Sequence, residues 1–202
     1  MGAHAVLIAH ALDAKEPTVL ALAGVLSAAF ERHGRQQLPL PGLDAKATRQ
    51  LLARWFPGAD AALGLDWPTL AHAHRLEPRS DEIEEVASLL RDHSNLNADN
   101  QEASAAIAWV IACACLGNNH LWQDLGLPSR HELSLLMSHW FPTLAARNVQ
   151  NMKWKKFFYK QLCEREDIMI CKAPTCGVCT DHNICFGPED GQVIIFTESI
   201  NQ

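Results

Sequence analysis

Apolar residues recur every three or four positions in several stretches of the chain, and this spacing predicts helices. The predicted helices cover residues 16–33, 44–56, about 80–90, 105–116, 129–140 and about 149–165. Gly34 ends the first pattern and Pro57 ends the second, because both residue types interrupt helices. Residues 58–78 look irregular or shortly helical, and residues 95–100 are expected to form a loop.

Three of these stretches carry signals beyond periodicity. Residues 105–116 are twelve consecutive apolar positions, too few to cross a bilayer but suited to a helix surrounded by others. They are predicted to form the central core helix. Ser129 and Glu132 form a capping-box pair at the start of the following helix, and Ser80 or Asp81 is expected to cap the helix over 80–90.

The lack of repeats and the near lack of strand patterns define the predicted fold class. The sequence has no internal repeat, and only Val193 to Phe196 has strand character. We therefore predict an all-α fold, with a helical bundle over residues 1–168 and an irregular, cysteine-rich metal-binding tail over residues 169–202 packed on it. A chain of 202 residues that is 48% hydrophobic can bury one core of this kind.

Charge and cysteine usage narrow the class of partner. A net charge of −6 gives no overall electrostatic reason to bind nucleic acid or an anionic membrane. The apolar run from Ala5 to Leu12 is shorter than a membrane span and has no basic region before it. We expect no nucleic-acid partner and no membrane partner. Seven cysteines, four of them crowded together, favour a reducing cytoplasm over a disulfide framework.

The crowded cysteines form the most informative motif of the chain. Cys171, Cys176, Cys179 and Cys185 are spaced as Cys-x4-Cys-x2-Cys-x5-Cys in a turn-rich segment. Thiols bind metal as thiolates, and four thiolates held together repel one another unless a cation or cluster compensates their charge. The motif therefore predicts a metal site with four sulfur ligands.

The spacing by itself leaves more than one metal open. A Cys-x2-Cys pair suits zinc or an iron–sulfur cluster, because two intervening residues let the backbone aim both sulfurs at one centre. Zinc sites usually take two close pairs separated by a longer loop, and this motif has no such form, which favours an iron–sulfur cluster. A structural four-cysteine zinc site in an interaction module is the alternative. Free thiols or a disulfide-linked tail are a further reading.

The sequence also resembles the NifQ family of nitrogen-fixation proteins. The resemblance is carried by the four-cysteine motif and the Phe-Gly-Pro-Glu that follows it at 186–189. It extends upstream through HLWQDLGL at 120–127, MKWKKFFY at 152–159 and Leu162-Cys163, which is roughly the C-terminal half of the chain. Residues 1 to about 98 resemble the family only in their alanine- and leucine-rich helical character, and residues 191–202 are not matched.

The resemblance implies a cytoplasmic iron–sulfur protein that carries molybdenum and supplies it for assembly of the nitrogenase iron–molybdenum cofactor. It implies Cys171, Cys176, Cys179 and Cys185 as cluster ligands, molybdate as the source of the metal, and two partners: the nitrogenase cofactor-assembly scaffold complex and the nitrogenase iron protein. Molybdate is a hard oxyanion, whereas the finished cofactor holds molybdenum largely among sulfides. The carrier is expected to take the metal from oxygen to sulfur ligation.

Three further residues are candidates for the metal site. Cys163 precedes Cys171 by eight residues, near enough to be a fifth ligand or an exchange thiol, although a buried structural cysteine is the commoner case. His182 lies inside the cysteine segment, and His120 lies in the family-like segment at a helix boundary. Each histidine is able to bind a metal or donate to a cluster sulfur, but histidines at the surface are more common.

Other polar residues receive weaker interpretations. Cys113 and Cys115 are separated by about 200° around a helix, so they cannot share one metal and are read as core packing. Lys153, Lys156 and Lys160 share one helix face, which permits steering of an oxyanion but is more typical of a solvated surface. We find no nucleotide-binding loop, metalloprotease motif or Ser/His/Asp signature, and expect no catalytic activity.

Overall fold

The computed structural model describes residues 1–95, 101–168 and 176–189. Every regular element within these ranges is a helix, as the all-α prediction requires. The helices are α1 (Ala3–Ala9), α2 (Pro17–His33), α3 (Ala45–Trp55), α4 (Ala59–Leu63), α5 (Trp67–Leu70), α6 (Ser80–Asp92), α7 (Gln101–Cys115), α8 (Leu121–Asp124), α9 (Arg130–Trp140), α10 (Pro142–Arg147), α11 (Trp154–Arg165), η2 (Cys176–Val178) and α12 (His182–Phe186). The predictions for residues 96–100 and for Val193 to Phe196 lie outside the described residues.

The predicted ends of the early helices agree with the structure, apart from one cap. Gly34 closes α2 with a φ of 79°, a value that glycine adopts without strain. The side chain of Asp44 caps α3 by accepting a hydrogen bond from the amide of Ala47 at 2.7 Å. The predicted cap of α6 was wrong, because Ser80 is already the first helical residue and Arg79 occupies the cap position.

Ser129 caps α9 as predicted, but not as a complete capping box. Its hydroxyl accepts a hydrogen bond from the amide of His131 at 3.0 Å and donates one to the carboxylate of Glu132 at 2.6 Å. The Glu132 carboxylate therefore bonds the Ser129 side chain. The helix ends at Trp140, and Pro142 starts α10 as its first residue, where its missing N–H is not needed.

The helix predicted from residue 149 begins later, at Trp154. Asn151 has a φ of 56°, which is incompatible with a helix. The Asn148 side chain holds residues 148–152 in a turn. Its amide donates to the carbonyl of Met152 at 2.9 Å and its oxygen accepts from the amide of Met152 at 2.8 Å. Side-chain bonds of this kind compete with helical bonds, and here they replace the first turn of the predicted helix.

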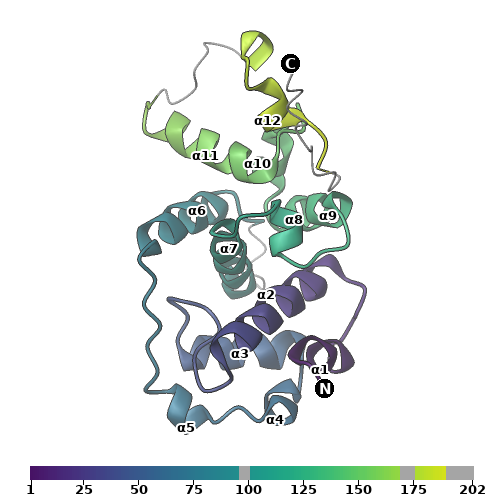
Figure 1. The fold of residues 1–202 in the computed structure, drawn as a ribbon, viewed down its shortest axis with the longest axis vertical. Helices are drawn as coiled ribbons and strands as arrows, with labels where there is room; N and C mark the ends of the chain where they lie inside the picture. Colours follow the sequence, from purple (N-terminus) through teal and green to yellow (C-terminus); the bar gives the residue numbers. More distant parts are fainter. Residues whose placement is uncertain (96–100, 169–175, 190–202) are drawn as a thin grey trace, which may run out of the picture.

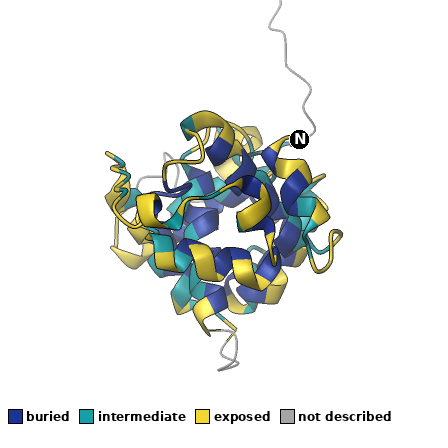
Figure 2. Ribbon diagram, turned by 90° about the horizontal axis from the view of Figure 1, so that it is seen from below, coloured by how far each residue is buried: buried dark blue, intermediate teal, exposed yellow. Residues whose placement is uncertain are grey.

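The helix α7 lies at the centre of the fold, as its apolar sequence predicted. It packs against α6, α2 and α8 (Figure 1). Ile107, Ala108 and Ile111 are almost fully buried on it. Figure 2 shows buried residues on the inward sides of the surrounding helices and exposed residues on their outer sides. Burial of these apolar faces is the main force that holds the bundle together.

A pair of glycines lets α2 approach the short helix α8 closely. A Cβ atom on Gly24 would lie 2.3 Å from the carbonyl oxygen of Leu125, and one on Gly126 would lie 2.8 Å from the Cα of Gly24. Gly126 also has a φ of 68°. Any larger residue at either position must separate the two backbones, so this contact depends on glycine on both sides.

The helices α10, α11 and α12 lie at one end of the molecule, and α1, α4 and α5 lie at the opposite end (Figure 1). The described part of the cysteine-rich segment therefore sits next to the last long helix. No helix among the described residues has the length and apolar character needed to cross a bilayer.

Candidate metal centre

The cysteine-rich segment contains more regular structure than the predicted irregular tail. Cys176 opens the 3-10 turn η2, the amide of Cys179 closes it on the carbonyl of Cys176 at 3.2 Å, and Cys185 lies on the short helix α12. All three side chains are partly exposed. Cys171, the first cysteine of the motif, lies outside the described residues. The structure therefore describes three of the four predicted ligands, on two consecutive turns.

Two contacts attach this segment to the helical body. The backbone amide of Lys153, at the start of α11, donates a hydrogen bond of 2.8 Å to the carbonyl of Cys185. The carboxylate of Glu189 forms an ion pair with the Arg130 guanidinium, and its side chain is only 6% exposed. A buried carboxylate needs such a partner, because an unpaired charge away from water is strongly unfavourable.

Arg130 also fixes the turn that precedes α11. Its Nη2 atom donates to the carbonyls of Asn151 and Met152, at 3.0 and 2.8 Å, and to the Asn151 side chain at 2.9 Å. One guanidinium thus joins α9, the turn before α11 and the end of the cysteine segment. Sequence reasoning did not single out Arg130. The only signal for its partner was the position of Glu189 inside the family-like Phe-Gly-Pro-Glu motif.

Local packing shapes the end of the segment. The rings of His182 and Phe186 stack with centroids 4.5 Å apart. A Cβ atom on Gly187 would lie 2.4 Å from the carbonyl oxygen of Asn183, so only glycine permits this close turn after α12. His182 also donates its backbone amide to the carbonyl of Cys179 at 3.2 Å. The His182 backbone and ring thus support the fold of the segment, and its role as a ligand stays a prediction.

The cysteine sulfur atoms are chemically suitable ligands for an iron–sulfur cluster or for zinc. Cysteine sulfurs are the ligands both centres prefer, and among the described residues no two cysteines are joined by a disulfide. Within the ranges that the structure describes, no three histidine, cysteine, aspartate or glutamate side chains are close enough to hold a metal ion. The predicted four-sulfur site includes Cys171, which those ranges do not contain, and therefore stays a prediction.

The two cysteines of α7 have a different environment. Cys115 is buried in the core, and burial raises its pKa to about 12. Burial likewise raises the pKa of Cys113 to about 12, although Cys113 is only partly buried and borders a cavity. Both are neutral thiols near pH 7, so neither is prepared to bind a metal. Their predicted role in packing is confirmed, because Cys115 belongs to the core and Cys113 packs against it.

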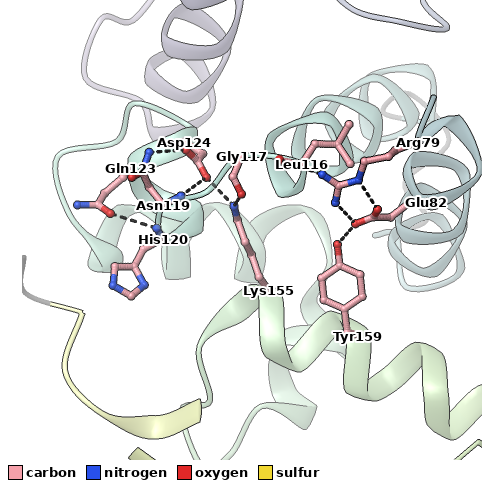
Figure 3. Close-up of polar contacts among 10 residues, drawn as sticks. All are labelled: Arg79, Glu82, Leu116, Gly117, Asn119, His120, Gln123, Asp124, Lys155 and Tyr159. Carbon is pink, nitrogen blue, oxygen red and sulfur yellow. Dashed lines mark hydrogen bonds and ion pairs between the residues drawn. The ribbon is translucent and has the colours of Figure 1, made fainter. Parts of the chain in front are cut away.

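The remaining candidates lie on the helical body. Cys163 is partly exposed near the end of α11, and its carbonyl accepts a hydrogen bond from the amide of Ile168 at 2.8 Å. His120 caps α8, and its backbone amide donates to the side chain of Gln123 at 3.1 Å. Figure 3 shows the His120 ring pointing away from Asp124. The structure gives neither residue a ligand role, and both predictions stay open.

Two polar links hold α11 against the body, and sequence reasoning missed both (Figure 3). The Lys155 ammonium donates to the carboxylate of Asp124 at 2.5 Å and to the carbonyl of Gly117 at 2.7 Å. The Tyr159 hydroxyl donates to the carboxylate of Glu82. Each link joins residues at least 31 positions apart in the sequence, so periodicity within one helix gives no sign of it.

The Glu82 carboxylate is also held by Arg79, whose Nε and Nη2 atoms each lie 2.7 Å from one of its oxygens. The hydrogen bonds from Arg79 are the main reason that the pKa of Glu82 is lowered. Glu82 is therefore ionised at neutral pH, and its carboxylate can accept the hydrogen bond from the Tyr159 hydroxyl. The pair fixes α6 beside α11, the helix that leads to the cysteine segment.

The three lysines proposed to steer an oxyanion do not share one free helix face. Lys153 is the N-cap of α11, Lys156 is exposed on the helix, and the Lys160 ammonium lies 2.8 Å from the carboxylate of Glu164. The later start of α11 removes Lys153 from the helix. One of the three charges is also balanced by its neighbour.

The structure thus defines a class: a helical protein that carries a short, thiol-rich segment at one end. Comparison with known families shows which family of this class the chain belongs to. Residues 21–187 match the family model named NifQ, which is more than half of the chain. The protein therefore belongs to the NifQ family and has a role in nitrogen fixation.

Individual relatives agree with this assignment. The chain is 43% identical to Protein NifQ of Azotobacter vinelandii over 166 residues, which cover 79% of this chain and 84% of the relative. It is 42% identical to the Protein NifQ homolog of Sinorhizobium fredii over 75% of this chain and 62% of the relative. Protein NifQ of Klebsiella pneumoniae is 49% identical over 43% of this chain and 52% of its own length. No solved structure matches the fold.

The family match is longer than the sequence motifs indicated. Residues 1 to about 98 were expected to share only helical character with the family, but the match begins at residue 21, within α2. It ends at Gly187, inside the Phe-Gly-Pro-Glu motif at 186–189, so the tail over 191–202 lies outside the match, as expected.

Proposed function

We propose that this protein is an iron–sulfur molybdenum carrier that supplies molybdenum for assembly of the nitrogenase iron–molybdenum cofactor. The observation that carries the proposal is the four-cysteine motif, whose described members are partly exposed to solvent within the family match. It acts as a donor of metal and not as a catalyst. Its proposed site of action is the cytoplasm.

Cys171, Cys176, Cys179 and Cys185 are the residues that would hold the cluster. When bound, the cluster supplies sulfide ligands, which suit molybdenum after its oxygen ligands are removed. The partly exposed cysteines leave the centre accessible for exchange with a partner, since a fully buried site would have to unfold before releasing its cargo. Lys153 and Arg130 support this arrangement by fixing the C-terminal part of the described segment, at Cys185 and Glu189, to the helical body.

The proposed partners follow from the direction of transfer. Molybdate is the source of the cargo, and the receivers are the nitrogenase cofactor-assembly scaffold complex and the nitrogenase iron protein. Direct transfer protects a thiolate-bound metal from water and oxygen. The end of the molecule that carries α11 and α12 is the surface that a receiver would meet (Figure 1).

Metal analysis of protein purified without oxygen tests the proposal. We expect iron, acid-labile sulfide, molybdenum and visible absorption in the intact chain, and loss of all of them in a variant with the four cysteines changed to serine. A colourless protein filled with zinc would instead support a structural four-cysteine zinc site in an interaction module. Protein that is folded and active in cells without iron or molybdenum would overturn the proposal.

A further inference from the structure

A cavity of about 290 Å³ lies between the end of α2, the 39–41 segment, residues 75–79 and the end of α7. Its volume is several times the roughly 30 Å³ that a water molecule occupies in the liquid. It lies at the lower limit of ligand pockets, which begin at roughly 300 Å³. The cavity therefore suits a small ligand that keeps part of its hydration.

The walls of this cavity carry basic side chains from two segments, α2 and the connection between α5 and α6. Arg32 and His33 come from α2, Arg75 follows α5, and Arg79 precedes α6. Arg75 donates to the carbonyl of Pro39 and, at 2.9 Å, to Nε2 of His33. Guanidinium is only a donor, so Nε2 of His33 accepts and its Nδ1 carries the proton. This arrangement leaves three N–H groups of Arg75 for a ligand.

The acidic groups near the cavity do not balance these charges. Asp124 is paired with Lys155, and Glu82 is paired with Arg79. Among the described wall residues, Glu77 is then the acidic side chain left to balance the two charges of Arg32 and Arg75. Arg32 has no hydrogen bond or ion pair with another described residue. The walls therefore carry excess positive charge together with unused N–H donors.

The protonation of the neighbouring groups agrees with an anionic ligand. Burial, followed by the charges of Arg75 and Arg32, lowers the pKa of His33, so the ring is neutral and adds no charge of its own. Cys113 also lines the cavity, and burial raises its pKa to about 12, so it remains a neutral thiol. A site for a soft metal cation needs thiolates, and this cavity offers none among its described walls.

We propose that this cavity binds a small tetrahedral oxyanion between Arg32 and Arg75, and that the anion is molybdate. The choice of molybdate rests on the proposed function, whereas the oxyanion chemistry rests on the cavity itself. Planar guanidinium groups present several N–H donors in the geometry that oxyanions accept. The site would hold the incoming metal as its oxyanion, separate from the sulfur ligands in the cysteine-rich segment.

Equilibrium dialysis with molybdate, followed by elemental analysis, tests this site. The protein is the full chain with its four tail cysteines changed to serine, which removes the proposed cluster but leaves the cavity. We expect binding of about one molybdate, weakened about tenfold by Arg75→Gln and further by adding Arg32→Gln, because each change removes charge-assisted hydrogen bonds. Arg49→Gln, on the exposed surface of α3, removes the same charge elsewhere and should have no effect. Circular dichroism checks that every variant remains helical.

The outcomes separate this site from the proposed function. Molybdate binding that the two arginine changes leave unaltered would overturn the site. Sulfate or phosphate that displaces molybdate at equal concentration would overturn the choice of molybdate and support a more general oxyanion site. Iron and molybdenum content of the cysteine-intact chain is measured in parallel. Normal metal content beside an empty cavity would reject the site alone, and missing iron beside a working cavity would reject the cluster alone.

Discussion

The cysteines of α7 and those of the C-terminal segment show how surroundings determine what the same side chain can do. Cys115 is 4% exposed among apolar neighbours, and burial raises its pKa to about 12. Cys176 and Cys179 lie on a short turn, with their side chains partly exposed. A thiol that cannot lose its proton packs like a small apolar residue, whereas an accessible thiol in a cluster can become a metal ligand.

The two regions also differ in how they are held. The α7 helix is fixed by apolar contacts along most of its length, so loss of one side chain leaves many others in place. The described cysteine segment packs only partly buried side chains such as Phe186 against the core, and its polar attachments are chiefly the Arg130–Glu189 pair and the bond from Lys153 to Cys185. Its position should therefore respond sharply to single polar substitutions.

The largest contrast is expected from alanine substitutions at the two sets of cysteines. Cys176→Ala or Cys179→Ala should remove most of the iron from anaerobically purified protein, because each removes one predicted cluster ligand. Cys113→Ala and Cys115→Ala serve as the matched controls and should retain iron and visible absorption. Equal losses in both sets would show that the distinction between them is wrong.

A second test removes the contact that anchors the cysteine segment. Arg130→Gln leaves the carboxylate of Glu189 buried without its cation, which costs about 3 kcal/mol for a buried pair. We expect earlier unfolding in urea and faster release of iron to a chelator.

Arg165→Gln is the control for this test, because Arg165 is exposed and its nearest acidic oxygens are 3.3 and 3.7 Å away. Its effect on the free energy of unfolding should stay below about 0.5 kcal/mol. Glu189→Gln should fall between the two, since a neutral amide can still accept from Arg130. Identical iron release from Arg130→Gln and the control would refute the anchoring role.

The buried thiol of Cys115 should make stability depend on alkaline pH. Its pKa of about 12 in the folded protein exceeds the value of 9.0 for an ordinary thiol, so the unfolded chain loses this proton first. The stability contributed by the neutral thiol is complete below pH 9 and declines as the pH rises toward 12. Relative to pH 8, roughly 1 kcal/mol should be lost at pH 10. Urea unfolding of the wild type and of Cys115→Ala at pH 8 and pH 10 isolates this change. An equal loss of unfolding free energy in both proteins between these pH values would contradict it.

The smallest effect is expected for the lysines of α11. Changing Lys153, Lys156 and Lys160 to glutamine should alter the free energy of unfolding by less than about 0.5 kcal/mol, because charges at the surface, the Lys160–Glu164 pair included, contribute little in water. If these lysines steer oxyanions, molybdenum loading should fall more than iron content, most clearly at low ionic strength. Unchanged loading would leave the arginine-lined cavity as the remaining proposed entry for molybdate.

The sequence by itself was sufficient for the helical class and for most helix positions. Periodic apolar residues and local caps such as Asp44 act within a few residues, so their effect is readable along the chain. It was also sufficient for the cysteine motif, since ligand type and spacing are local properties. The start of α11 was missed because Asn148 and Arg130 impose a turn through side-chain bonds that no helical period records.

Tertiary structure decided which distant residues meet. The Arg130–Glu189 pair joins positions 59 apart, and Arg75 reaches His33 across 42 positions to build the cavity. Each of these residues looks like an ordinary surface charge in the sequence, and its burial and partner arise only when the helices pack. Local periodicity is set by neighbouring residues, whereas pairing, burial and the resulting pKa shifts depend on contacts between segments that the chain keeps far apart.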